Sequence, residues 1–453
     1  MTANRLSLNT VFSDAKDDDF IICTDKDKTY SKRQLKQAVY KLYQYLKDRG
    51  SIKEVAICTK NSYYFDIAFF ACLYARKTPV LLGNFTDKSL IEDKDRYDAL
   101  ILDTPQKDND KDITEDFFDC INNAVTFKTL CLNDNCSIIL YTSGSTGNSK
   151  RIVKTLKQME HEANLLKDTF NLNDLSNDIK VLSTVPPYHM YGLTFRVFMP
   201  LFNHFTFGAN LTHYTEELCN ESGDILLISS PAFIKRIDVN IKAPSIIKVF
   251  SAGAPLQKDV AKSFYNWTGI AVTEIYGSTE TNVIAYKQNT GDDSDFTPFD
   301  GISFYKDNDE NTILKSPMID GDFKLDDRLT FNDCGHFVIE GRKDRIIKLE
   351  EKRVSLTQIE TLSKESLHVL DAVALPVEKR NRVFIGLVLQ VDKDFYKSID
   401  DCIRHDFVKD LKSHLKDYLP NIAIPRYIRI VDMIETNSMG KKITSRLQEL
   451  FND

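Results

Sequence analysis

The chain has 453 residues, 42% hydrophobic and 28% charged, which suits more than one domain and a substantial buried core. Its formal net charge of −7 argues against a broad basic face for nucleic acid. No apolar run reaches the roughly 18 residues of a membrane helix, and the N-terminus lacks a secretory signal pattern. With nine cysteines outside any CxxC or metal-ligand spacing, we expect a cytoplasmic protein with reduced thiols and no transmembrane segment.

Short apolar strands alternate with helical patterns through most of the chain. Apolar residues recur at helical spacing over residues 31–50, ending at Gly50, and a second helix is predicted over residues 63–76. The predicted strands are 54–58, 78–82, 99–103, 137–141, 181–185, 224–229 and 246–253. This alternation predicts an α/β fold with helix-covered, largely parallel sheets.

The elements become shorter after Arg345. A helix is predicted near residues 355–370, strands at 372–377 and 383–391, and a helix at 399–418. These elements predict a separate α+β domain of about 110 residues. Two polar segments are expected at the surface: an acidic insertion at 106–119 and an exposed turn at 306–312.

A polar loop, TSGSTGNSK, follows the predicted strand at 137–141. Its backbone N–H groups, hydroxyls and the Lys150 ammonium are suited to a polyphosphate. The Walker pattern is not met, because Gly144 and Gly147 are too close together and Arg151 replaces the magnesium-binding hydroxyl. A flexible turn with one solvated lysine is the alternative interpretation.

Two further loops have suitable chemistry. In EIYGSTET (274–281), Glu280 could hold Mg²⁺ beside phosphates, because hard cations prefer carboxylate oxygen. In FSAGAPL (250–256), small residues could admit a flat adenine ring against the backbone. A buried glutamate satisfied by its neighbours is the alternative interpretation of the acidic residue.

Five motifs in chain order resemble those of the ANL superfamily of adenylate-forming enzymes, which includes acyl- and aryl-CoA synthetases. They are YTSGSTGNSK, SAGAPL, YGSTE, the region from Leu325–Asp327 through CGHFVIEGRKDRIIK, and NSMGKK. The resemblance spans Tyr141 to Lys442. It implies a large N-terminal domain, 1–343, and a small mobile α+β C-terminal domain, 344–453, which rotates about a hinge at Asp344 between two half-reactions.

The resemblance also implies ATP as co-substrate, Mg²⁺ as cofactor and a role for each matching residue. The phosphate-binding positions would be Thr142, Ser143, Gly144, Ser145, Thr146, Gly147 and Lys150. The adenine side would be formed by Gly253, Ala254, Pro255, Tyr276 and Gly277. Thr279 would touch the α-phosphate, Glu280 would bind Mg²⁺, and Asp327 would bind the ribose with support from Arg342. Lys441 would be the catalytic lysine that bridges the carboxylate and the α-phosphate, with Lys442 as a competitor for that role.

PPYHMYGL (186–193) resembles the acid-pocket motif of CoA ligases in the same superfamily, which places His189 beside the substrate carboxylate. Amino-acid-activating members have an aspartate in this neighbourhood and YHM offers none, so a fatty or aryl acid is favoured over an amino acid. A run of phenylalanines downstream could line a lipophilic pocket or belong to the core: Phe195, Phe198, Phe202, Phe205 and Phe207.

Three departures from the family pattern bear on function. Ser149 replaces a proline in the phosphate loop, and Leu325–Asp326–Asp327 replaces a threonine–glycine–aspartate pattern. Glu350 and Glu351 stand where many CoA ligases have glycine, near the expected pantetheine path. The thiol acceptor could therefore be CoA or a phosphopantetheinyl acyl carrier protein.

We therefore expect ATP-dependent formation of acyl-AMP and pyrophosphate, followed by acyl transfer to a pantetheine thiol. The alternatives are an aryl-CoA ligase of succinylbenzoate type, a P-loop-type nucleotide hydrolase, and a degenerate nucleotide-binding protein without ligase activity.

Overall fold

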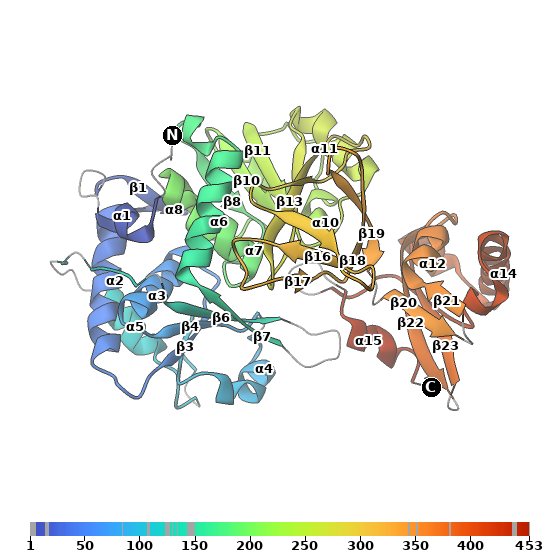
Figure 1. Cartoon of the computed structure of the whole chain (residues 1–453), viewed down its shortest axis with the longest axis horizontal. Helices are drawn as coiled ribbons and strands as arrows, with labels where there is room; N and C mark the ends of the chain where they lie inside the picture. The colour runs from blue at the N-terminus through green and yellow to red at the C-terminus, as the bar shows by residue number, and fades with distance from the viewer. Residues whose placement is uncertain are drawn as a thin grey trace. The chain divides into compact units, whose positions relative to one another are not determined.

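The computed structural model describes residues 6–13, 18–83, 85–106, 109–122, 127–128, 130–133, 135–142, 150–342, 345–349, 352–379, 382–436 and 442–452. The chain divides into two compact units. The larger unit comprises Met1–Ser303 and Leu314–Phe323, and the smaller one Phe304–Ile313 and Lys324–Asp453. Figure 1 shows the mixed helices and strands that confirm the α/β prediction. The predicted hinge residue, Asp344, lies outside the described residues.

A five-stranded sheet forms the first part of the larger unit, in the order β5-β3-β4-β6-β7. Its strands are β3 (Glu54–Cys58), β4 (Thr78–Leu81), β5 (Ala99–Leu102), β6 (Ser137–Thr142) and β7 (Lys150–Thr155). All run parallel except β7, which returns antiparallel to β6. The associated helices are α2 (Lys32–Lys47), α3 (Ser62–Tyr74), α4 (Asp87–Glu92), η1 (Lys94–Arg96) and α5 (Thr114–Ile121). Ser31 starts α2 with a capping box and Asn61 caps α3, so each helix begins at a side chain that satisfies its first N–H groups.

A nine-stranded sheet forms the rest of the larger unit, in the order β14-β13-β12-β11-β10-β8-β9-β1-β2. Its strands are β1 (Ile21–Asp25), β2 (Lys28–Ser31), β8 (Lys180–Ser183), β9 (Thr206–Gly208), β10 (Ile225–Ser229), β11 (Ile246–Ser251), β12 (Val272–Ser278), β13 (Asn282–Asn289) and β14 (Thr297–Pro298). The six central strands are parallel, and β2, β13 and β14 add antiparallel edges.

Nine further helical segments within the described residues belong to this part of the larger unit: α1 (Leu8–Ser13), α6 (Leu156–Thr169), η2 (Leu172–Asp174), α7 (Met190–Gly192), the π-helix η3 (Leu193–Phe198), α8 (Met199–Asn203), α9 (Thr215–Cys219), α10 (Pro231–Ile234) and α11 (Lys258–Thr268). The Ser230 side chain caps the start of α10. No helix in the described ranges has the length and apolar character needed to span a membrane. All nine cysteines are free thiols.

The predicted acidic insertion at 106–119 is wrong in its second half. Residues from Thr114 onward form α5, the Phe117 side chain is fully buried, and Thr114 Oγ1 accepts a hydrogen bond of 2.9 Å from Leu102 N of β5. The acidic side chains of this segment therefore mask an amphipathic helix whose apolar side belongs to the core.

The phenylalanine run belongs to the core rather than to a ligand pocket. All five side chains are at most 1% exposed. Phe198 contacts Phe69 of α3 at a ring distance of 6.0 Å, and Phe195 contacts Phe250 of β11 at 5.1 Å. This is the ordinary way to bury large aromatic surface.

The smaller unit contains the hairpin β18 (Asp327–Phe331) and β19 (Phe337–Arg342), the pair β20 (Ile346–Leu349) and β21 (Lys352–Ser355), and the sheet β22 (Val369–Lys379), β23 (Arg382–Val391) and β24 (Tyr427–Val431). Its helices are α12 (Leu356–Ser363), α13 (Lys393–Ser398), α14 (Asp401–Tyr418), η5 (Asn421–Ala423) and α15 (Thr444–Glu449). Three short strands form another sheet: β15 (Ser303–Lys306), β16 (Thr312–Lys315) and β17 (Phe323–Lys324). The expected turn at 306–312 joins β15 and β16, and Asp307 N donates to Asn311 O at 3.1 Å.

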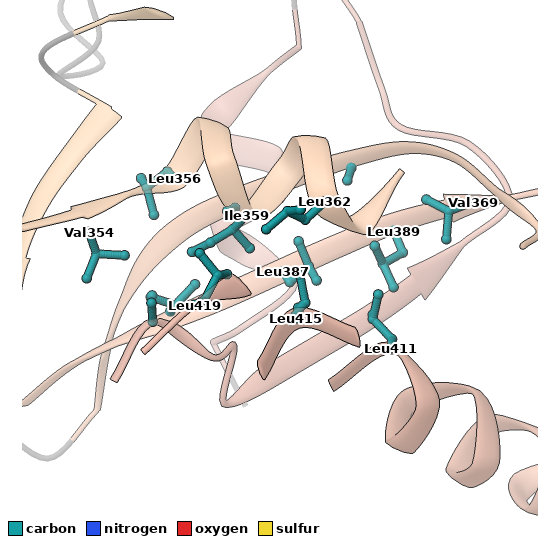
Figure 2. Close-up of a cluster of buried hydrophobic side chains, with 14 of the residues drawn as sticks. Val354, Leu356, Ile359, Leu362, Val369, Leu387, Leu389, Leu411, Leu415 and Leu419 are labelled. Atoms are coloured by element: carbon teal, nitrogen blue, oxygen red, sulfur yellow. The ribbon is translucent and has the colours of Figure 1, made fainter. Parts of the chain in front are cut away.

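The core of the smaller unit lies where α12 and α14 cover β22 and β23 (Figure 2). Ile359 of α12, Leu387 of β23 and Leu415 of α14 are each 0% exposed in this cluster. The helix predicted at 355–370 ends earlier, at Ser363, because strand β22 begins at Val369.

We expect Leu415→Ala to lower the free energy of unfolding of the smaller unit by about 2–5 kcal/mol, because it leaves a cavity in this cluster. Ile403→Ala removes a 38%-exposed apolar side chain from the same helix and should have a much smaller effect. Hydrogen exchange of the β22 and β23 amides measures both. Equal protection in the two variants would contradict this account of the core.

Candidate active site

Four of the motifs in the larger unit follow the carboxyl ends of parallel strands. Residues 142–150 follow β6, residues 186–193 follow β8, residues 253–255 follow β11, and residues 276–280 end β12. Ligands of open α/β sheets bind at this edge, because the loops that leave it carry the variable polar groups. The fold therefore presents these motifs where a ligand is expected.

The β6–β7 hairpin carries the predicted phosphate loop. Thr142 and Lys150 lie opposite each other in the antiparallel register and close the hairpin. The predicted phosphate-binding residues between them, Ser143 to Gly147, lie outside the described residues.

Two lysines of β7 converge on Glu280. Lys150 Nζ lies 3.3 Å from Glu280 Oε1, and Lys154 Nζ donates to the Glu280 backbone oxygen at 2.6 Å. The structure thus brings the predicted phosphate-binding lysine and the predicted metal-binding carboxylate together. The Lys150 side chain is 60% exposed, and such an exposed pair contributes only about 0–1 kcal/mol. Both groups can therefore exchange partners at little cost.

The turn between β12 and β13 presents Thr279 and Glu280. Ser278 N donates to Thr281 Oγ1 at 3.1 Å, and Thr281 N donates to Ser278 Oγ at 3.2 Å, so the two hydroxyls brace the turn. Gly277 is required by close approach, because a Cβ there would lie 2.3 Å from the Asn282 backbone oxygen. Tyr276 lies on β12 with its ring 5.8 Å from the Phe296 ring.

A buried carboxylate of α6 holds the other side of this turn. Glu162 accepts hydrogen bonds from Asn282 Nδ2 at 3.1 Å, Val283 N at 2.8 Å and Thr194 Oγ1 at 2.6 Å. Burial raises the pKa of Glu162, and these hydrogen bonds oppose the rise. The start of β13 is thereby tied to α6.

Lys154 itself is 3% exposed. Burial lowers the pKa of its ammonium to about 8, while Glu162, Glu280 and Asp320 act in the opposite direction. The Lys154 ammonium is therefore shielded from water and donates a short hydrogen bond to the backbone oxygen of Glu280.

The loop Gly253–Ala254–Pro255 is exposed between buried Ala252 and Leu256. Buried Glu274 of β12 fixes its end, because Glu274 Oε2 accepts from Leu256 N at 2.9 Å. The other oxygen, Oε1, accepts from Asn289 Nδ2 at 2.7 Å and lies 3.2 Å from Lys287 Nζ. The predicted adenine-side loop is thus joined to the strand that carries Tyr276.

His189 lies at the start of α7, half-buried. A Cβ on Gly83 would lie 3.5 Å from His189 Cε1 and 3.1 Å from the Tyr141 backbone oxygen, so the ring lies beside the ends of β4 and β6. Tyr188 packs edge-on against Phe85 at 4.7 Å. The surroundings of this histidine are therefore rich in aromatic side chains.

The smaller unit carries the predicted ribose residues. Asp327 and Arg342 face each other in the register of the β18–β19 hairpin, and Arg342 Nη2 lies 3.5 Å from Asp326 Oδ2. Two predicted residues of this unit, Lys441 and Asp344, lie outside the described residues, as do Glu350 and Glu351.

Lys442, the competitor for the catalytic role, is engaged within the smaller unit. Its Nζ donates to Asp371 Oδ1 at 2.8 Å and to the Ala372 backbone oxygen at 3.1 Å. These contacts join the segment at Lys442 to β22.

The residue types of the site fit a magnesium–triphosphate. Glu280 offers a carboxylate oxygen, Lys150 an ammonium group, and Thr142 and Thr279 hydroxyl donors. Mg²⁺ in such sites is commonly held by one or two carboxylates together with substrate phosphates. Within the described ranges, no group of three or more His, Cys, Asp or Glu residues is arranged to hold a metal alone.

Sequence reasoning missed three residues of this arrangement: Lys154, Glu162 and Glu274. Glu274 has a local signal, because it precedes the YGSTE motif on the same strand. Lys154 lies an even number of residues from Lys150, which places both on one face of a strand. Glu162 has no such signal, since its partners on the turn, Asn282 and Val283, are 120 residues or more away along the chain.

Comparison with known proteins gives a family match and a similar ligase. Residues 84–305 match the family model described as AMP-binding enzyme. A D-alanine–D-alanyl carrier protein ligase of Staphylococcus aureus (strain Newman) is 24% identical over 434 residues, covering 83% of this chain and 80% of the relative.

Two solved structures show the same fold. ATP-bound MatB from Rhodopseudomonas palustris superposes with a TM-score of 0.80 at 19% identity, covering 98% of each chain. The o-succinylbenzoate CoA synthetase of Bacillus subtilis, in complex with its acyl-adenylate intermediate, gives a TM-score of 0.78 at 17% identity over 95% of each chain. The family match over residues 84–305, together with these similarities, confirms the predicted resemblance to the ANL superfamily of adenylate-forming enzymes.

We expect Gly277→Ala to disrupt the β12–β13 turn, because the added Cβ would lie 2.3 Å from the Asn282 backbone oxygen and the backbone would have to shift. ATP binding, measured by calorimetry, should fall at least about tenfold, in line with the 1–3 kcal/mol cost of overpacking. Gly50→Ala is the matched control, since a Cβ there meets nothing within 4 Å. Wild-type affinity in Gly277→Ala would contradict the role of this close approach.

Proposed function

We propose that the chain is an AMP-forming acid–thiol ligase that activates a fatty or aryl carboxylic acid with Mg²⁺–ATP. The convergence of Lys150 and Glu280 at the carboxyl ends of β6 and β12 carries the proposal. This contact brings an ammonium group and a carboxylate together within the region that matches the AMP-binding family, which supports roles for them in binding phosphate and metal. ATP and reduced pantetheine thiols, together with the nine free cysteines, are consistent with a cytoplasmic location.

In the first half-reaction, a carboxylate oxygen of the acid attacks the α-phosphorus of ATP and the bond to pyrophosphate breaks. His189 orients the carboxylate, and Thr279 donates to the α-phosphate. Lys150 and the loop from Thr142 bind the β- and γ-phosphates. Glu280 would hold Mg²⁺, which would offset the negative charge of the phosphates. Lys441 neutralises the charge that develops between the carboxylate and the α-phosphate.

In the second half-reaction, a pantetheine thiolate attacks the acyl carbon and AMP leaves. The smaller unit carries both Lys441 and the Glu350–Glu351 segment, so its rotation about Asp344 would exchange one for the other at the site. The similarity to a carrier protein ligase favours a phosphopantetheinyl acyl carrier protein as acceptor, with CoA as the alternative.

The aromatic surroundings of His189 favour a fatty or aryl acid, since the Tyr188 ring lies beside it and packs against Phe85. The same relative favours one second candidate substrate, D-alanine. An α-ammonium group would need a carboxylate partner near His189, and YHM supplies none.

The proposal is tested by pyrophosphate release from Mg²⁺–ATP across fatty, aryl, hydroxy and amino acids, D-alanine included. CoA and a phosphopantetheinylated carrier protein are added in separate arms. We expect release that depends on a fatty or aryl acid and turnover that rises with one thiol. Acid-independent formation of ADP would instead identify a nucleotide hydrolase, and ATP binding without any product would identify a degenerate binding protein.

We expect Lys441→Ala to lower the adenylation rate by about 10²–10³-fold, the usual cost of removing one preorganised electrostatic group. Thioester formation from added acyl-AMP should change far less. Lys442→Ala is the matched control: it loses the Asp371 contact and should affect stability more than adenylation. A larger adenylation loss in Lys442→Ala than in Lys441→Ala would reverse the assignment.

A further inference from the structure

Lys154 is a buried charge whose presence the fold alone does not require. It lies opposite Ile138 in the β6–β7 register, and its side chain is 3% exposed. Taking an ammonium group out of water is costly, and an apolar side chain of similar volume often stabilises a protein more than a buried ion does. Lys154 therefore calls for an explanation outside the stability of the core.

Its contact supplies that explanation. Lys154 Nζ donates to the backbone oxygen of Glu280 at 2.6 Å, while Lys150 Nζ meets the side chain of the same residue at 3.3 Å. The two lysines lie on one face of β7, about 13 Å apart along the strand. Lys150 contacts the side chain of Glu280, and Lys154 contacts its backbone. One strand of the five-stranded sheet thus contacts, at two points, a single residue in the turn between β12 and β13 of the nine-stranded sheet.

The two contacts differ in permanence. The Lys150 contact is exposed and exchangeable, whereas the Lys154 contact is buried, and a buried hydrogen bond to a charged group is costly to leave unmade. Glu162 fixes the next residues of the chain through Asn282 and Val283. The backbone of Glu280 is therefore held between β7 and α6 whichever partner its carboxylate has.

We propose that Lys154 is a positioning residue for nucleotide activation: it fixes the Glu280 backbone, so that the carboxylate stays directed at Mg²⁺–ATP when Lys150 turns to the phosphates. This inference rests on the proposed function of the site. Partners of a metal-binding carboxylate commonly change metal affinity about 10–100-fold when they are removed.

The test is the metal-dependent gain in ATP affinity, measured by calorimetry as the ratio of the dissociation constants without and with Mg²⁺. Lys154→Met should lower this ratio about tenfold or more, while the affinity for metal-free ATP changes little. Thermal unfolding should change little, because the replacement of a buried ion by an apolar side chain offsets the loss of one hydrogen bond. Lys180→Met is the matched control, since it removes another ion-paired lysine, that of β8 with Glu221.

A double-variant cycle separates positioning from a structural role. In a Glu280→Gln background, adding Lys154→Met should cause no further loss of the ratio, because the carboxylate to be positioned is gone. A wild-type ratio in Lys154→Met, or an equal loss in the Glu280→Gln background, would overturn the role of Lys154 alone. A ratio near one in the wild-type protein would overturn the proposed magnesium–ATP function together with it.

Discussion

The arrangement of the candidate site depends on one set of contacts, those that join the five-stranded sheet to the residues around Glu280 at the end of β12. β7 of the five-stranded sheet reaches Glu280 through Lys150 and Lys154, and α6, which follows β7 directly, reaches the start of β13 through Glu162. The interactions combine an exposed ion pair with buried hydrogen bonds. A fixed backbone with an exchangeable carboxylate is what the binding of a metal-complexed triphosphate requires.

The position of these contacts follows from the topology. β6, β8, β11 and β12 are parallel members of two sheets, so the loops after them emerge at carboxyl edges, where ligands bind in α/β folds. The remaining proposed groups belong to the smaller unit, whose own core lies between α12, α14 and the strands β22 and β23. The larger unit thus contains the residues proposed to bind the phosphates and the acid, while Asp327, Arg342 and Lys441 belong to the smaller unit.

The sequence was sufficient for the fold class and for the location of the motifs, because apolar strands and glycine-rich loops are local signals. It failed at residues 114–119, where acidic side chains concealed the buried face of α5. Local pattern also could not identify Glu162 or the contact of Lys154, since each depends on a partner more than 100 residues away. The contact of Lys442 with Asp371, 71 residues away, could not be found from local pattern either.

Transfer of a carboxylate oxygen to AMP tests the central claim most directly. The preferred acid, labelled with ¹⁸O in its carboxylate, is turned over with ATP, Mg²⁺ and the thiol acceptor, and the nucleotide product is analysed by mass spectrometry. Attack of the carboxylate on the α-phosphorus predicts AMP that carries one ¹⁸O atom from the acid. Unlabelled AMP, or label in orthophosphate with ADP as the nucleotide product, would contradict adenylate formation.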